Sequence, residues 1–177
     1  MAMKTKLPGF LLFVAFAAIL LPSCSKDDWQ EGDAWYDEWA TCYFFGNGLG
    51  DRSSFMLDIR QGHTADGETL VSGKETHLLL FAPPVTDGRI PTGEYVVSDI
   101  IDHGLVVKKG MANLADGSYF AFCDRPQQKW ERVPIESGKV RIDQHADGYD
   151  IRLRVVAGGG YYDYRYSVNA WTVNMAN

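Results

Sequence analysis

The sequence predicts an all-β domain, and three observations carry the prediction. From residue 41 onward, apolar and polar residues alternate in several short runs, which is the period of a strand with one wet face. Dipeptides ending in glycine recur between these runs and are typical of tight turns. No segment after residue 40 keeps a helical apolar period over about ten residues, whereas residues that favour strands are plentiful. We therefore expect mostly antiparallel strands joined by hairpins.

The first 23 residues predict an export signal. Lys4 and Lys6 precede an apolar run from Leu7 to Leu21 that contains no acidic residue, as in a signal peptide. The run is shorter than the roughly 20 apolar residues that a membrane-spanning helix needs, so a transmembrane anchor is the weaker interpretation. We expect residues 1–23 to be removed.

The end of this run, Leu21-Pro22-Ser23-Cys24, resembles the lipobox of bacterial lipoprotein precursors. The resemblance implies that Cys24 is lipidated and becomes the first mature residue, so that the membrane is a partner through the lipid. Ser25-Lys26-Asp27-Asp28 then resembles the acidic tract of surface-exported lipoproteins of Bacteroidetes, although a solvated linker has the same composition. Together these two short motifs imply a lipid-anchored protein of the outer membrane, exposed at the cell surface.

Charge limits the classes of partner. Residues 1–23 hold two lysines and no carboxylates, so their removal leaves 154 residues and changes the formal net charge from −6 to −8. Nucleic acid is not an expected partner, because phosphate backbones favour basic surfaces. The remaining length suits one domain of about 100 to 150 residues.

Residues 24–40 form an acidic stem that contains three of the five tryptophans. Trp35 and Trp39 are four residues apart, so a short helical turn would place them on one face. We favour packing of this face onto the domain, because large aromatic side chains are more often buried than displayed. The alternative is an exposed platform for a sugar ring or a partner protein.

Residues 41–177 are expected to form a single β domain. Alternation predicts half-buried strands over Phe55–Ile59, Val140–Ile142 and Tyr149–Val155, and the continuous apolar run Leu78–Phe81 predicts a central strand covered on both faces. Turns are expected at Asn47-Gly48, Asp66-Gly67, Asp87-Gly88, Asp116-Gly117 and Asp147-Gly148. We prefer an antiparallel two-sheet sandwich of about eight to ten strands, with an up-and-down, lipocalin-like barrel as the alternative.

Several short words resemble small β-rich lipoproteins of Bacteroidales, whose roles are mostly unassigned. They are Ala82-Pro83, Ile90-Pro91-Thr92-Gly93-Glu94-Tyr95, Gly117-Ser118-Tyr119 and Gly138-Lys139-Val140. The resemblance spans roughly residues 75–173 and implies the fold more than any activity.

An aromatic segment follows the triple glycine at residues 158–160. In a strand, Tyr162, Tyr164 and Tyr166 would face one side, while Tyr161 and Trp171 would face the other. We favour the interpretation that one side belongs to the core and the other covers the sheet surface. The alternative gives the outer side a role in ligand binding.

The cysteines and histidines do not form a recognisable metal-binding or catalytic motif. Cys42 and Cys123 either form one disulfide in an oxidising compartment or remain two buried thiols. The histidines occur singly, so a zinc site would have to be assembled from distant strands, and no metal or other cofactor is expected. No nucleophile motif such as GxSxG appears, so an enzyme is not supported. The four histidines are His63, His77, His103 and His145.

Three functions remain, in order of preference. The first is a non-catalytic binding or accessory module at the cell surface that captures nutrients or glycans, with Trp35, Trp39, Tyr161 and Trp171 as contact residues. The second is a structural lipoprotein that docks onto a larger envelope complex. The third is a hydrolase, suggested only by abundant carboxylates.

Overall fold

The computed structural model describes residues 37–48, 51–64, 70–111, 116–124 and 129–176. The predicted signal peptide, Cys24 and Trp35 lie outside these ranges. The described residues form nine strands and confirm the all-β prediction. The strands are β1 (Asp37–Phe44), β2 (Ser53–Thr64), β3 (Leu70–Ala82), β4 (Gly93–Ser98), β5 (Val106–Lys108), β6 (Tyr119–Asp124), β7 (Lys129–His145), β8 (Gly148–Ala157) and β9 (Gly160–Asn174).

The nine strands belong to one mixed, largely antiparallel sheet. Its order is β2-β1-β9-β8-β7-β4-β5-β3-β6, and β2 also pairs with β3 while β6 also pairs with β7. Each described strand therefore has a paired neighbour on both sides over at least part of its length. Two pairs are parallel, β1 with β9 and β4 with β5. The alternating patterns do not reveal them, because alternation is the same in both directions.

Two long strands change partner along their length. The lower half of β3, Gly73–His77, pairs with β6, whereas its residues Leu80 and Phe81 pair with β5. On the other side, β7 pairs with β6 up to Pro134 and with β4 from Lys139 onward. Between β3 and β7, the short strands β4 and β5 therefore complete the pairing at one end of the sheet, and β6 completes it at the other end.

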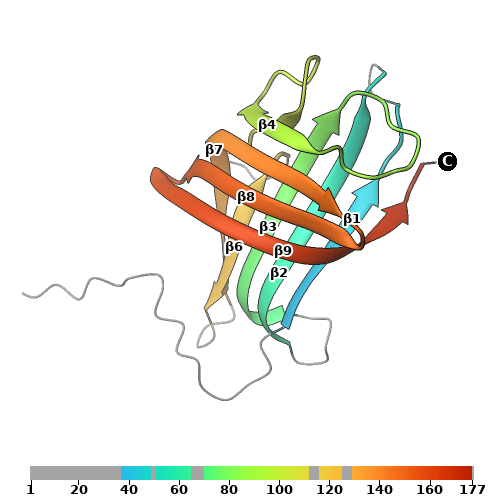
Figure 1. The fold of residues 1–177 in the computed structure, drawn as a ribbon. Helices are drawn as coiled ribbons and strands as arrows, with labels where there is room; N and C mark the ends of the chain where they lie inside the picture. The colour runs from blue at the N-terminus through green and yellow to red at the C-terminus, as the bar shows by residue number, and fades with distance from the viewer. Residues whose placement is uncertain (1–36, 49–50, 65–69, 112–115, 125–128, 177) are drawn as a thin grey trace, which may run out of the picture. The chain divides into compact units, whose positions relative to one another are not determined.

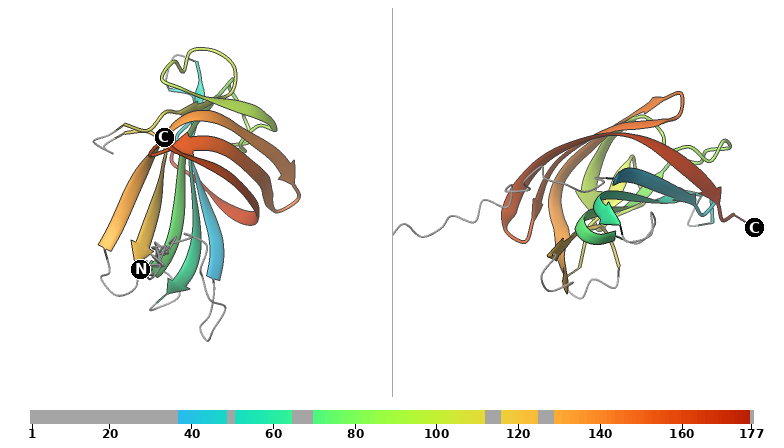
Figure 2. Two further views of the ribbon diagram at one scale, coloured as in Figure 1. Left: turned by 90° about the vertical axis from the view of Figure 1, so that its left-hand side faces the viewer. Right: turned by 90° about the horizontal axis from the view of Figure 1, so that it is seen from below.

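The core lies between strands that are not hydrogen-bonded neighbours. Figure 1 and both views of Figure 2 show β7, β8 and β9, drawn in orange to red, curving across the strands of the N-terminal half. Phe120 of β6 contacts Tyr162 and Tyr164 of β9, with ring centroids 5.2 and 5.5 Å apart. The hydroxyl groups of Thr76 in β3 and Tyr166 in β9 are 2.8 Å apart in the buried interior. One face of β9 therefore belongs to the core, as the alternation predicted.

The predicted half-buried strands have their apolar residues inside. The core includes Phe55, Leu57, Ile59, Leu78, Leu80, Val140, Ile142, Tyr149, Ile151, Leu153 and Val155. The predicted turn at Asp147-Gly148 joins β7 to β8, where His145 pairs with Gly148. The start of the domain differs from the prediction, because β1 begins at Asp37, inside the expected stem. Trp39 consequently lies in a strand and not in a helical turn.

Candidate functional site

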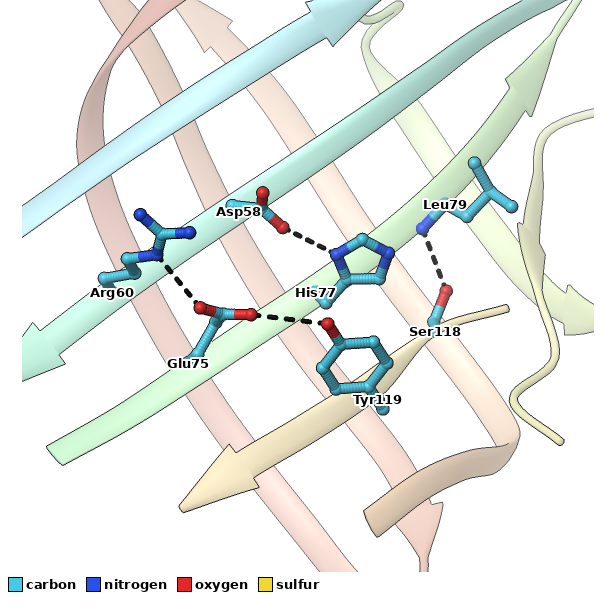
Figure 3. A network of polar contacts seen from close by, with 7 residues as sticks. All are labelled: Asp58, Arg60, Glu75, His77, Leu79, Ser118 and Tyr119. Carbon is cyan, nitrogen blue, oxygen red and sulfur yellow. Dashed lines mark hydrogen bonds and ion pairs between the residues drawn. The ribbon is translucent and has the colours of Figure 1, made fainter. Parts of the chain in front are cut away.

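A network of polar side chains covers the outer face of β2, β3 and β6, opposite the core (Figure 3). Asp58 of β2 lies directly across from His77 of β3 in the antiparallel register, and Arg60 lies across from Glu75. Tyr119 of β6 is the partner of His77 on the other side. Period-two alternation explains the arrangement, because the neighbours of inward Leu57, Ile59, Thr76 and Leu78 must point outward.

The contacts within this network are short and directional. The Nδ1 atom of His77 is 2.6 Å from Oδ1 of Asp58. Arg60 donates through Nε to Oε2 of Glu75 at 2.9 Å. The hydroxyl of Tyr119 donates to Oε1 of Glu75 over a longer distance of 3.4 Å. The rings of His77 and Tyr119 are stacked, with centroids 4.5 Å apart and an interplanar angle of 12°. These contacts fix both the position and the plane of the imidazole.

The network is half-buried although it faces outward. The exposed fractions of the side chains of Asp58, His77 and Glu75 are 11%, 15% and 16%. Burial and the nearby Glu75 carboxylate raise the pKa of Tyr119, while the Arg132 guanidinium, 4.9 Å from the ring centroid, opposes that rise. Tyr119 therefore remains a neutral hydrogen-bond donor at neutral pH.

The Asp58–His77 pair does not complete a catalytic triad with Ser118. A carboxylate that orients a histidine is half of the arrangement that activates a serine nucleophile. However, the Ser118 hydroxyl is fully buried and accepts a hydrogen bond from the backbone N–H of Leu79 at 3.0 Å. What the network offers chemically is a set of converging nitrogen and oxygen donors.

A second feature is a slot at the seam between β1 and β9. The parallel pairing of these strands begins only at Ala40 and Ala170, so residues 160–169 of β9 pair with β8 alone among the described strands. Where the strands diverge, they leave an open slot of about 570 Å³. Its lining is Glu38, Trp39, Ala40, Thr41, Ser167, Val168 and Asn169. The slot thus combines one indole ring with hydroxyl, amide and carboxylate groups.

The structure places the described contact residues Trp39, Tyr161 and Trp171 in two regions of the sheet. Trp39 is half-buried and lines the slot. Tyr161 is 67% exposed near the start of β9, where its neighbour in register is Val156 of β8. Trp171 lies further along β9, beside Thr41 of β1. The slot therefore includes Trp39 but not Tyr161, whereas the backbone of Trp171 pairs with β1 only two residues from Trp39.

The disulfide between Cys42 and Cys123 is not formed, which corrects one of the two alternatives. Both side chains are buried, but β2 and β3 lie between β1 and β6. Through the register, Cys42 is level with Leu78 of β3 and Cys123 with Gly73. The cysteines are therefore five residues apart along the strand direction, which is roughly 16 Å. The α-carbons of a disulfide lie within about 7 Å of each other.

Sequence reasoning missed the polar network and also an inward-facing lysine. The Lys74 ammonium lies 3.6 Å from the centroid of the Tyr164 ring, on the inner side of β3. The pattern Glu75-Thr76-His77 did contain a signal, since two polar residues flank a buried one on a strand. The partner Asp58 could not be assigned, because the register between β2 and β3 is not readable from either strand alone.

Comparison with protein-family models, curated proteins and solved structures finds no match for this chain. No helix in the described part of the chain has the length and apolar character to cross a membrane.

Proposed function

We propose that this protein is a lipid-anchored, non-catalytic binding module that captures glycans at the cell surface. The observation that carries the proposal is the slot between β1 and β9. Its volume of about 570 Å³ falls within the roughly 300 to 1,000 Å³ of small-ligand sites. An aromatic ring can stack on the apolar face of a sugar, while Thr41, Ser167 and Asn169, which alternate to the same face of the sheet as Trp39, provide partners for its hydroxyl groups.

The finer fold belongs to the same proposal. The described strands form a ring of pairings with neighbours on both sides, which favours the barrel alternative over two separate sheets. The ring of pairings has one gap among the described strands: residues of β9 before Ala170 do not pair with β1. The slot lies at this gap between β1 and β9.

The proposed site predicts a specific loss of binding. The full-length protein in mild detergent is titrated with soluble oligosaccharides of two to four hexose or N-acetylhexosamine units, by calorimetry. We expect at least one to bind, and Trp39→Ala to weaken that binding by about fivefold or more, because a stacked aromatic contributes roughly 1 kcal/mol. Asn169→Ala should weaken it as well.

Trp130→Ala is the matched control, because Trp130 is a partly exposed tryptophan on β7 that does not line the slot. It should bind like the unmodified protein. Equal affinity of Trp39→Ala and Trp130→Ala would remove the slot as the binding site, and no binding by any oligosaccharide of the set would remove the glycan proposal.

One observation favours the second candidate, a lipoprotein that docks onto an envelope complex. Residues 160–169 of β9 present a sheet edge without a described partner opposite β8. A strand edge can bind an extended segment of another protein by backbone hydrogen bonds.

Location and partners are tested together in cells. Export and lipidation at Cys24 predict that the protein fractionates with membranes and that Cys24→Ser moves it to the soluble fraction. On intact cells, added protease should cleave the surface-exposed protein, and mild purification should recover it with glycan-processing or transport proteins. Protection from protease, together with recovery on structural envelope proteins, would instead support the docking role.

A further inference from the structure

We propose that Asp58, Glu75 and His77 bind a single Zn²⁺ ion on the outer face of β2 and β3. One donor atom from each of the three side chains can be chosen such that all three lie within 4.8 Å of one another. None of the three donors lines the slot, although Thr41 of the slot is the register partner of Asp58. Zinc binding is measured directly, so its test does not depend on the proposed glycan binding. It adds a metal to a chain whose sequence predicted none.

The backbone register brings the three donors together. Asp58 and His77 are directly opposite each other on neighbouring antiparallel strands, where side chains are about 5 Å apart at Cβ. Glu75 precedes His77 by two residues on the same strand and therefore points to the same side. The donors come from adjacent regular strands, so their positions do not depend on a loop.

The imidazole is held with its Nδ1 atom toward one of the carboxylate donors, 2.6 Å from Oδ1 of Asp58. Figure 3 shows Nδ1 of His77 directed toward the side on which both carboxylates lie. Stacking on Tyr119 holds the ring plane. Such preorganisation lowers the cost of assembling a metal site, because little side-chain freedom is lost on binding.

The imidazole nitrogen makes the donor set fit zinc better than calcium or magnesium, which take oxygen ligands. Zn²⁺ takes both imidazole nitrogen and carboxylate oxygen, and three protein ligands leave its fourth position to water or another ligand. Calcium requires about six to eight oxygen ligands, more than these two carboxylates supply. The low exposure of the three side chains, between 11% and 16%, also strengthens their attraction for a cation.

The surrounding contacts can persist around the ion. Zinc replaces the direct hydrogen bond between His77 and Asp58 and draws on Oε1 of Glu75, whose contact with Tyr119 is long at 3.4 Å. Arg60 remains on the other oxygen, Oε2, at 2.9 Å. Arg60 and Tyr119 then act as outer partners that orient the Glu75 ligand.

The test is metal binding by the full-length protein after chelator treatment. Calorimetry with ZnCl₂ should give one site per chain, and CoCl₂ should produce the visible absorption of a four-coordinate cobalt centre. His77→Asn and the isosteric Asp58→Asn should each weaken zinc binding by about 100-fold or more, since losing even an outer partner costs 10- to 100-fold. Circular dichroism establishes that each variant is folded.

His103→Asn is the matched control. His103 is 88% exposed and its Nε2 lies 3.4 Å from Asp102, so it represents ordinary surface binding by a histidine next to a carboxylate. It should leave the affinity and the cobalt spectrum unchanged. The proposal is overturned if the unmodified protein shows no stoichiometric site and no cobalt absorption, or if folded His77→Asn and Asp58→Asn bind zinc as tightly as His103→Asn.

Discussion

Replacing Gly138 with alanine is expected to lower the free energy of unfolding by about 4 kcal/mol. Gly138 has a φ of 124°, a conformation that residues with a side chain rarely adopt. A Cβ atom there would lie 2.3 Å from the carbonyl oxygen of Arg154 and 2.7 Å from Cα of Val155. Both are backbone atoms of the paired strand β8, so the clash cannot be relieved by rotating a side chain.

The position explains why the glycine is needed. Gly138 lies just beyond the irregular pairing at Ile135 and Ser137, between the part of β7 that pairs with β6 and the part that pairs with β4. A strand that changes partner must bend, and a glycine or a bulge permits the bend. Movement of β7 away from β8 would disturb the core on both sides of Gly138.

Alanine variants at two other glycines distinguish the cost of a positive φ from the cost of the backbone clash. Gly159 has a φ of 75° but nothing within 4 Å of an added Cβ, so Gly159→Ala should cost only about 1 to 2 kcal/mol. Gly48 also has open space and no positive φ, and Gly48→Ala should be nearly neutral. Urea unfolding of the three variants measures the series. A loss for Gly138→Ala no larger than that for Gly159→Ala would show that β8 tolerates the new methyl group.

The sequence allowed the strands to be predicted but not their arrangement. The runs Phe55–Ile59 and Tyr149–Val155 could be assigned because each pattern of burial is local to one strand. The insertion of β4 and β5 between β3 and β7 could not, because it depends on where two distant strands separate. The parallel seam of β1 and β9 was unreadable for the same reason.

The candidate sites could be predicted only in part, because they also depend on how distant strands pair. Trp39 was selected as a contact residue from its type, and the structure places it at the slot. The slot itself arises where two strands diverge, which no single segment encodes. Likewise, His77 was judged as an isolated histidine, and only the register with β2 places Asp58 beside it.

Alkaline pH is expected to destabilise the fold strongly, because three weak acids are buried side by side in the core. Burial raises the pKa of the Cys42 thiol from its ordinary value of 9.0 to about 12. Burial is also the main cause of the raised pKa values of Tyr95 and Tyr149, and repulsion from the Cys42 thiolate adds to both. The Tyr95 hydroxyl donates to the carbonyl of Pro91 at 2.8 Å, so its ionisation would remove that hydrogen bond.

The sign follows from proton binding. Between pH 9 and 12 the unfolded chain releases the Cys42 proton while the folded chain retains it, so stability is fully present below pH 9 and falls as the pH rises. Cys42 alone should cost about 2 kcal/mol between pH 9 and 10.5, since one pKa unit corresponds to about 1.4 kcal/mol. The two tyrosines add to this loss above about pH 10, the ordinary pKa of the phenol.

Urea unfolding at about pH 7.5, 9 and 10.5, with reductant present, measures the decline, and variants identify its source. Cys42→Ala should be less stable than the unmodified protein at neutral pH because it leaves a cavity, yet it should lose about 2 kcal/mol less between pH 9 and 10.5. Tyr95→Phe should likewise flatten the decline above about pH 10. Tyr161→Phe, which alters an exposed phenol, should leave the pH dependence unchanged. If Cys42→Ala and Tyr95→Phe decline as steeply as Tyr161→Phe, ionisation of surface groups and not of the buried acids controls the alkaline stability.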